Sequence, residues 1–87
     1  MNEIYKLLIS NSAQREIRKL QKVELQKILL AIALFSTIPR PSGFKKLVGT
    51  HSTYRIRIGN YRVLDIIDDV IRIVEVSSVR HRRVAYE

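Results

Sequence analysis

The first part of the chain combines a short apolar run with an amphipathic segment. Residues 4–9, with the sequence IYKLLI, form a run too short for a helix and predict a buried strand. A serine after this run can cap a helix by accepting a hydrogen bond from a free amide of the first turn, and Ser10 and Ser12 are both candidates. Apolar residues then recur at helical spacing: Ala13, Ile17 and Leu20. This spacing predicts an amphipathic helix of about two to three turns.

A second helix is predicted over residues 23–36. Its apolar stripe is wide and consists of Leu25, Ile28, Leu29, Ile32 and Phe35. The segment 37–43, with the sequence TIPRPSG, ends this helix, because proline cannot continue a helix and disfavours helical geometry in the residue before it.

The second half of the chain reads as strands. Four are predicted, over residues 44–48, 54–58, 61–67 and 71–76. The element order is then β-α-α-β-β-β, which predicts an α+β fold with two helices packed on one face of a small, mostly antiparallel twisted sheet. A chain of 87 residues without a linker has room for one core, so residues 1–87 are expected to form a single domain.

Two turn signals predict how the last three strands pair. Gly59 and Asn60 suit a two-residue type II′ turn. This turn pairs Ile58 with Tyr61, Arg57 with Arg62, Ile56 with Val63 and Arg55 with Leu64. If Asp68 and Asp69 form the next two-residue turn, the last two strands pair Ile67 with Val70, Ile66 with Ile71, Asp65 with Arg72, Leu64 with Ile73, Val63 with Val74 and Arg62 with Glu75.

Side chains alternate across a strand, so this pairing predicts two different faces. The face expected to support the helices carries Tyr54, Ile56, Ile58, Tyr61, Val63, Val74 and Val76. The other face carries Arg55, Arg57, Arg62 and Glu75 near the glycine turn, and Leu64, Ile66, Ile71 and Ile73 towards the far end.

The arginines on the second face are unfavourable for the sheet itself. Arg57 and Arg62 are predicted to lie directly opposite each other, and like charges at that spacing destabilise a strand pair. Such a conflict is typical of functional positions, and a guanidinium matches the oxygens of phosphate. Arg55, Arg57 and Arg62 are therefore candidates for an anion site, although a solvated face with splayed side chains is an alternative.

A second basic group follows the last strand, within residues 79–86 (VRHRRVAY). Here Arg80, Arg82 and Arg83 surround His81, and Tyr86 comes after them. Because the last strand is antiparallel to the one before it, its end returns to the glycine turn and brings these residues to the first arginines. The alternative is a frayed basic terminus.

Composition and charge agree with an anionic partner. The sixteen Lys and Arg and eight Asp and Glu give a net charge of +8, which favours nucleic acid, an anionic membrane or an acidic protein, unless it serves only solubility. The chain has no cysteine, and this excludes disulfides, thiol nucleophiles and thiolate metal sites. The first residues lack the features of a signal peptide and no apolar run could span a bilayer, so a cytoplasmic location without membrane attachment is expected.

These residue types suit the cleavage of RNA by its own 2′-hydroxyl. Arginines can stabilise the pentacoordinate phosphate, and a proton acceptor and donor must come from other groups. Histidine is the side chain whose ordinary pKa lies near neutrality, which makes His81 the candidate for proton transfer. Tyr86 can stack on a base or donate a proton, although it can also simply tether the terminus. Two histidines and scattered carboxylates make a weak case for a metal, and no cofactor is expected.

Four segments together resemble the RelE/ParE toxin superfamily of toxin–antitoxin systems, and its RelE branch most closely. They are AQREIRKL at 13–20, the K-L-x-G step at 46–49, YRIRIGNYRV at 54–63 and the closing H-R-R-x-x-Y at 81–86. The resemblance implies a fold like that of small microbial ribonucleases and a metal-independent endoribonuclease that cuts messenger RNA in the ribosomal A site. It also implies a cognate antitoxin, the ribosome and messenger RNA as partners, with a heterotetramer of toxin and antitoxin as one arrangement.

The residues and the resemblance together predict a site. The expected catalytic residues are Arg57, Arg62, Arg82, His81 and Tyr86, and the expected RNA-binding residues are Arg55, Arg80, Arg83, Lys45 and Lys46. In the best-known members, lysines stand at the positions of Arg55 and Arg57, and one of them is a proposed base. Because arginine is a poor base, the difference directs attention to His81, or to catalysis mainly by positioning and charge stabilisation.

Three other functions remain open from the sequence. A ParE-like inhibitor of DNA gyrase would share the fold, but it would not need the converging arginines and the terminal tyrosine. A basic module that only binds RNA or an acidic protein, and a toxin that has lost its activity, are further alternatives.

Overall fold

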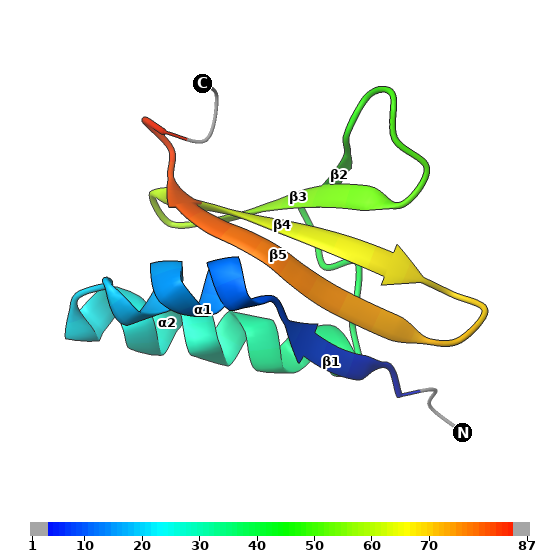
Figure 1. The fold of residues 1–87 in the computed structure, drawn as a ribbon, viewed down its shortest axis with the longest axis horizontal. Coiled ribbons are helices and arrows are strands. Elements are labelled where there is room, and N and C mark those ends of the chain that lie inside the picture. Colours follow the sequence, from blue (N-terminus) through cyan, green and yellow to red (C-terminus); the bar gives the residue numbers. More distant parts are fainter. Residues whose placement is uncertain (1–3, 85–87) are drawn as a thin grey trace.

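The computed structural model describes residues 4–84, which form one five-stranded sheet with both helices on the same face (Figure 1). The elements in chain order are β1 (Lys6–Ile9), α1 (Asn11–Arg18), α2 (Lys22–Ala33), the 3₁₀ turn η1 (Leu34–Ser36), β2 (Lys45–Lys46), β3 (Thr53–Ile58), β4 (Tyr61–Asp68) and β5 (Ile73–His81). The strand order is β1-β5-β4-β3-β2, with β1 parallel to β5 and the other neighbours antiparallel. The predicted α+β fold is confirmed.

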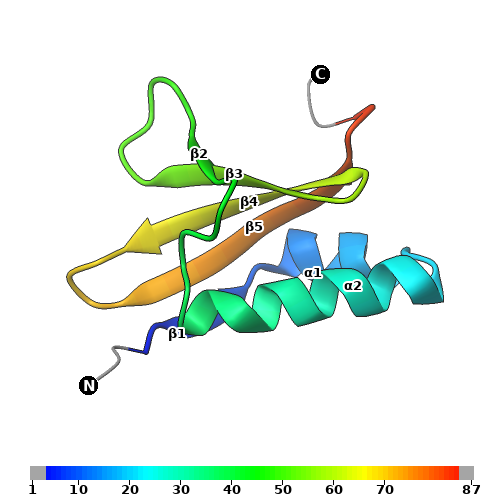
Figure 2. The ribbon, with the colours of Figure 1, turned by 180° about the vertical axis from the view of Figure 1, so that it is seen from behind.

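The two helices begin and pack largely as their sequences predict. Ser10, and not Ser12, caps α1, because its hydroxyl accepts a hydrogen bond from the amide of Ala13 at 3.1 Å. The longer α2 lies across the sheet (Figure 2) and continues into η1. Leu29, expected on its apolar stripe, is 42% exposed and lies at the border of the packed face. Within residues 4–84, no helix is long and apolar enough to cross a membrane.

The core lies between the helices and the inner face of the sheet. Its fully buried side chains include Ile28, Ile32, Phe35, Val63, Val74 and Val76. Strand β1, expected to be buried, is only half covered, and Lys6 and Leu8 are exposed. The reason is its place at the edge of the sheet, where the helices cover one face and leave the other open.

The predicted pairing of β3 with β4 is confirmed at every position. Ile58 lies opposite Tyr61, Arg57 opposite Arg62, and Ile56 opposite Val63. Gly59 has a φ of +59°, as the first position of a type II′ turn requires, and glycine takes this conformation without steric strain.

The predicted pairing of β4 with β5 is wrong. Asp68 belongs to β4 and lies opposite Ile73, so the turn is longer than two residues. The Asp68 carboxylate accepts hydrogen bonds from the amides of Val70 and Ile71 at 2.9 and 3.1 Å, and Arg72 adopts a φ of +57°. This side-chain-capped turn shifts the strand by four residues, and Glu75 therefore lies opposite Ile66 instead of Arg62.

A β-bulge then changes the direction of the side chains in the second half of β5. Leu64 pairs with Ser78 but Asp65 pairs with Val76, so Ser77 is an extra residue in β5. A bulge reverses the alternation of side chains beyond it. As a result, Arg80 lies on the open face, opposite Arg62, and His81 lies on the helix-covered face, opposite Tyr61.

Candidate functional site

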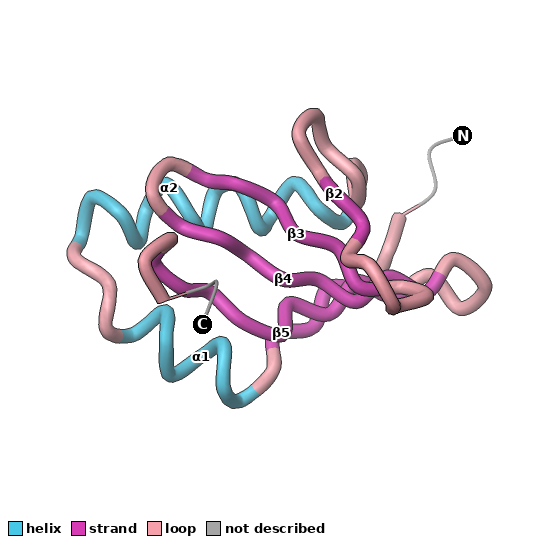
Figure 3. Tube along the Cα trace, turned by 90° about the horizontal axis from the view of Figure 1, so that it is seen from above, coloured by secondary structure: helices cyan, strands magenta, loops and turns pink. Residues whose placement is uncertain are grey.

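Three arginines form a row across three neighbouring strands of the open face. Arg57 on β3 lies opposite Arg62 on β4, and Arg62 lies opposite Arg80 on β5. Figure 3 shows these strands side by side with the helices behind them. We call Arg57, Arg62 and Arg80 the arginine row. Like charges in directly opposite positions repel, so this arrangement favours a bound anion.

Arg62 is the fixed member of the arginine row. Its side chain is only 8% exposed, and its Nη1 donates to the carbonyls of Gly59 and Tyr61, at 3.4 and 3.1 Å. These carbonyls belong to the hairpin turn itself. The turn therefore holds the guanidinium in place, which is the preorganisation that stabilises developing charge most effectively.

Arg80 and the edge of β5 share one carboxylate, that of Glu16 on α1. Glu16 Oε2 accepts a hydrogen bond from Arg80 Nε at 2.9 Å, and its Oε1 accepts one from the amide of Val79 at 2.8 Å. Glu16 thus joins the helix layer to the arginine row. The sequence analysis did not identify Glu16 as a partner of the arginines. The one signal that could have identified it is that Glu16 is the single acidic residue in α1.

The tail beyond β5 joins the glycine turn, as strand direction predicted. The amide of Arg82 donates to the carbonyl of Asn60 at 2.8 Å, and both Arg82 and Arg83 are exposed. In Figure 1, the described residues that follow β5, drawn in red, lie on the side of the sheet away from the helices. Tyr86, the predicted terminal tyrosine, lies outside the described residues.

His81 is not brought together with the arginine row. Its ring packs edge-on against Tyr61, with the ring centroids 5.4 Å apart, on the face that the helices cover. Its Nδ1 accepts a hydrogen bond from the amide of Arg83 at 3.2 Å. In a neutral ring with this bond, Nδ1 is the accepting nitrogen and Nε2 carries the proton. The accepting nitrogen therefore faces the tail and not the open face.

A basic groove continues from Arg57 towards the edge of the sheet. It has a volume of about 490 Å³ and is lined by Gly43, Phe44, Lys45, Arg55 and Arg57. Lys45 on β2 lies directly opposite Arg55 on β3, so both belong to the open face. Lys46 pairs with Tyr54 and lies on the other face, which separates it from the remaining predicted RNA-binding residues.

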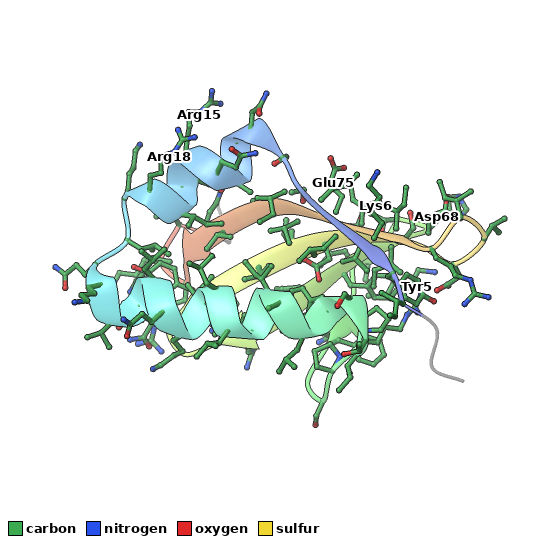
Figure 4. All side chains as sticks on the ribbon, turned by 90° about the horizontal axis from the view of Figure 1, so that it is seen from below. Tyr5, Lys6, Arg15, Arg18, Asp68 and Glu75 are labelled. Atoms are coloured by element: carbon green, nitrogen blue, oxygen red, sulfur yellow. The ribbon has the colours of Figure 1, made fainter. Side chains whose placement is uncertain are left out.

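The basic residues of α1 lie elsewhere. Arg15 and Arg18 point outward on the helix side of the molecule (Figure 4), where they do not add to the charge of the open face. Among residues 4–84, no three His, Asp or Glu side chains come together as ligands for a metal ion. The described basic side chains at this end of the open face are guanidinium and ammonium groups, which bind anions.

The opposite end of the sheet holds a different arginine, in a closed network. Arg40 donates to Asp69 at 2.8 and 3.1 Å, the Tyr5 hydroxyl donates to Asp69 at 2.6 Å, and Arg40 also lies over the Tyr54 ring. We call Arg40, Asp69, Tyr5 and Tyr54 the clasp. The hydrogen bonds from Arg40 and then Tyr5 hold the pKa of Asp69 below its ordinary value.

A second carboxyl, that of Asp65, has the opposite environment. It is fully buried beneath the helices, and neither of its oxygens has a hydrogen-bond partner among the described residues. Burial raises the pKa of Asp65 to about 7, because a carboxylate is poorly stabilised away from water.

Comparison of the sequence with known families gives one match over nearly the whole chain. The profile of the family described as "ParE toxin of type II toxin-antitoxin system, parDE" matches residues 7–86. A search of curated protein sequences gave no match.

The fold is also similar to solved toxin structures. A chain of the archaeal RelE–RelB complex from Pyrococcus horikoshii OT3 has a TM-score of 0.82 and 23% identity, over 94% of this chain and 99% of that one. A chain of the RelBE2 toxin–antitoxin complex from Mycobacterium tuberculosis has a TM-score of 0.68 and 28% identity, over 91% and 99% of the two chains. Toxin RelE from E. coli, as a mutant in the free state, has a TM-score of 0.77 and 25% identity, over 95% and 88%.

Proposed function

Because this chain belongs to the ParE toxin family of type II toxin–antitoxin systems, within the RelE/ParE superfamily, we propose that it is a toxin with ribosome-dependent endoribonuclease activity. The proposed substrate is messenger RNA in the ribosomal A site. The arginine row is the observation that carries this proposal: three arginines occupy directly opposite positions on neighbouring strands of the open face, at the end to which the basic tail returns.

The proposed reaction is an internal transfer at phosphorus. The 2′-oxygen loses its proton and bonds to the adjacent phosphorus, the bond to the 5′-oxygen breaks, and that oxygen takes up a proton. The products are a 2′,3′-cyclic phosphate and a 5′-hydroxyl. Negative charge increases on the phosphate oxygens in the transition state, and this charge is what Arg57 and Arg62 are placed to stabilise.

Charge stabilisation is the main catalytic contribution in this proposal. Arg62 is held by the carbonyls of its own turn, so little reorganisation is needed when the transition state forms. Arg82 follows β5 directly, and its backbone is bonded to that turn, which brings its exposed side chain to the same end of the sheet. His81 faces the helices, so its proposed role in proton transfer needs a rotation of the tail and is the weaker part of the site.

Inhibition of DNA gyrase is a second candidate, because the matching family profile is that of ParE toxins. The arginine row favours RNA cleavage, since inhibition by binding requires no group that stabilises a transition state. A binding module should lose function about equally for charge removal anywhere on the open face. A nuclease should depend on Arg57, Arg62 and Arg82 far more than on other arginines.

Primer extension tests the proposal directly. A defined messenger is incubated with the protein, with and without ribosomes that hold an empty A site. Cuts that require the ribosome, lie within the A-site codon and disappear for Arg82→Ala support the nuclease. Arg18→Ala, an exposed arginine on α1, is the matched control and should cut as the wild type does. An intact messenger in every reaction rejects the nuclease, and a gyrase supercoiling assay then tests the second candidate.

The proposed protein partner is a cognate antitoxin, because two of the similar structures are toxin–antitoxin complexes. The far end of the open face exposes apolar side chains that suit such a partner: Leu8 at 37%, Ile66 at 39% and Ile71 at 64%. Hydrogen exchange with and without the antitoxin tests this surface. Unchanged protection of β1 and of the β4–β5 turn would assign the antitoxin to another surface.

A further inference from the structure

The outward face of α2 is apolar, whereas the outward face of α1 is charged. Arg15 and Arg18 project from α1 (Figure 4). On α2, the side chains of Val23, Leu30 and Leu34 are each more than half exposed. A helix with apolar residues around most of its circumference is normally buried around most of it, yet the sheet covers only one side of α2. The exposed side of α2 is therefore a candidate contact surface for another protein chain.

The exposed apolar residues of α2 form one stripe along the helix. Val23, Leu30 and Leu34 are separated by about two turns and one turn, so they share a face. The amide of Ile38 donates to the carbonyl of Leu34 at 2.8 Å, so Ile38, also more than half exposed, continues this face by one further turn. We call Val23, Leu30, Leu34 and Ile38 the outer stripe. At 1.5 Å per residue, the outer stripe is about 22 Å long.

Lys27 falls within the outer stripe, but its charged end is directed elsewhere. It lies one turn after Val23 and one turn before Leu30. Its Nζ and Cδ lie 3.7 and 3.8 Å from the position that a Cβ on Gly59 would take, so the side chain reaches over the glycine turn. The aliphatic stem of a lysine can cover apolar surface while its ammonium stays in water. The outer stripe is therefore not interrupted by a charge.

We propose that the outer stripe is the interface of a homodimer, in which α2 packs antiparallel against α2 of a second copy about a two-fold axis at Leu30. Leu30 lies seven residues after Val23 and eight before Ile38. Val23 of each copy then meets Ile38 of the other, and the two Leu30 side chains meet at the axis. An interface about a two-fold axis must be complementary to itself, and a stripe centred on Leu30 meets this requirement.

The charges around α2 favour a second copy in this orientation. Lys22 is the first residue of α2, at the positive end of the helix dipole, and the last turn has no basic residue at the negative end. Antiparallel packing brings Lys22 of each copy to the C-terminal end of the other helix, where a cation is stabilising. The arginine row lies on the face of the sheet that the helices leave open (Figure 1), so the two rows point away from each other.

The proposed antitoxin surface does not account for the outer stripe. Its apolar residues, Leu8, Ile66 and Ile71, belong to the open face, and a dimer through α2 leaves that face free. A stable interface buries about 800 Å² on each partner, which is more than one helical stripe supplies. The dimer should therefore be weak, with a Kd on the order of 100 µM.

Sedimentation velocity tests the dimer on the wild-type chain. Between about 5 and about 500 µM, we expect the chain to change from mostly monomer to mostly dimer. Leu30→Glu places two carboxylates together at the axis and should stay monomeric throughout. Val48→Glu makes the same charge change at a fully exposed residue of the β2–β3 loop and should associate as the wild type does. Thermal unfolding of both variants shows that they are folded.

Two outcomes of this experiment overturn the inference. One is a wild type that stays monomeric at every concentration, which leaves the outer stripe to the proposed antitoxin. The other is a Leu30→Glu variant that associates as strongly as the wild type. A third measurement concerns salt: an apolar interface between two chains of charge +8 should hold or strengthen as salt screens their repulsion, and a dimer that dissociates in salt would contradict it.

The absence of cysteine from the chain allows a disulfide to report the orientation of the two helices. Leu30→Cys should form a covalent dimer under mild oxidation, because the two thiols meet at the axis. Val23→Cys should not, since antiparallel packing separates the two thiols by the rise of fourteen residues, about 21 Å. Equal yields from the two variants, or a higher yield from Val23→Cys, overturn the antiparallel dimer. None of these measurements depends on cleavage, so their failure leaves the proposed nuclease unaffected.

Discussion

The two ends of the sheet both hold arginines, but they hold them for different purposes. At the clasp, Arg40 meets a carboxylate with two matched hydrogen bonds, and a tyrosine hydroxyl completes the set. At the glycine turn, Arg57, Arg62 and Arg80 occupy directly opposite positions on neighbouring strands, and Glu16 binds Arg80 at the edge of the row. The same residue type is part of a closed network at one end and of the proposed anion site at the other.

This difference suggests a criterion for telling a structural arginine from one in the proposed site. Burial is not that criterion, because Arg62 in the arginine row is less exposed than Arg40 in the clasp. The charge of the facing residue is the better guide: Arg40 binds the carboxylate of Asp69, whereas the residue directly opposite Arg57 on the next strand is another arginine, Arg62. Each of the following experiments alters one side of this contrast.

Substitution within the arginine row should give the largest effect. We expect Arg62→Ala to lower the single-turnover rate of cleavage on ribosomes by about a hundred- to a thousandfold, because a preorganised donor to the transition state is lost. Arg62→Lys should recover part of the rate. His81→Gln should stay within about fivefold of the wild type, since His81 lies on the helix-covered face. A large loss for His81→Gln with a small one for Arg62→Ala would reverse the assignment of roles.

Asp65 sharpens the contrast, because it is a fully buried acid whose oxygens have no hydrogen-bond partner among the described residues. Its pKa in the folded state is about 7, above its ordinary value of 3.8. The folded protein therefore holds this proton more tightly, and the free energy of unfolding should decrease as the pH rises from about 4 to about 7. At 1.36 kcal/mol per pKa unit, the decrease is at most about 4 kcal/mol.

Asp65→Asn tests this prediction, because asparagine does not titrate. The free energy of unfolding of the wild type, minus that of the variant, should decrease between pH 4 and pH 7. Above pH 7 this difference should stay constant. Urea unfolding of both proteins at pH 4.5, 6 and 8 measures the difference. Parallel pH profiles for the two proteins would mean that Asp65 is not protonated in the fold.

Glu16→Gln removes the charge that borders the arginine row. Glutamine can still accept the amide of Val79 through its side-chain oxygen, but it cannot form the ion pair with Arg80. We expect a loss of about 1 kcal/mol in the free energy of unfolding, together with tighter binding of oligoribonucleotides. Fluorescence anisotropy at two salt concentrations measures the binding. Weaker RNA binding would show that Glu16 positions Arg80 for the ligand.

Asp69→Asn should have the smallest effect. The side chains of Arg40 and Asp69 are 29% and 55% exposed, and ion pairs in contact with solvent contribute about 0.2 to 1 kcal/mol. The pKa of Asp69 is lowered in the fold, so its contribution is present near pH 7 and is lost as the pH falls through that lowered pKa. Thermal unfolding at pH 7 and pH 3 measures it, and RNA binding should not change.

Local sequence signals predicted much of the fold, with one clear failure. The glycine turn fixed the pairing of β3 with β4, because the conformation of Gly59 leaves little choice of register. The pairing of β4 with β5 was wrong because two aspartates looked like a two-residue turn. The Asp68 side chain instead caps a longer turn that depends on the left-handed conformation of Arg72. A single sequence contains no strong signal for that conformation in an arginine.

The site was predicted in outline and not in detail. Strand direction alone brought the basic tail to the glycine turn, and the bond between Arg82 and Asn60 agrees. The bulge at Ser77 was not predictable, and it decides that Arg80 and not His81 joins the open face. The place of Glu16 also depends on contacts between segments far apart in the sequence.

The most direct test of this account replaces one arginine by alanine at each end of the sheet. Single-turnover cleavage of the A-site codon on programmed ribosomes is measured for Arg57→Ala and Arg40→Ala, with thermal unfolding of both. We predict a loss of at least about a hundredfold for Arg57→Ala with little change in stability, and a rate within about threefold of the wild type for Arg40→Ala. Equal rates for the two variants would contradict the assignment of the arginine row as the catalytic site.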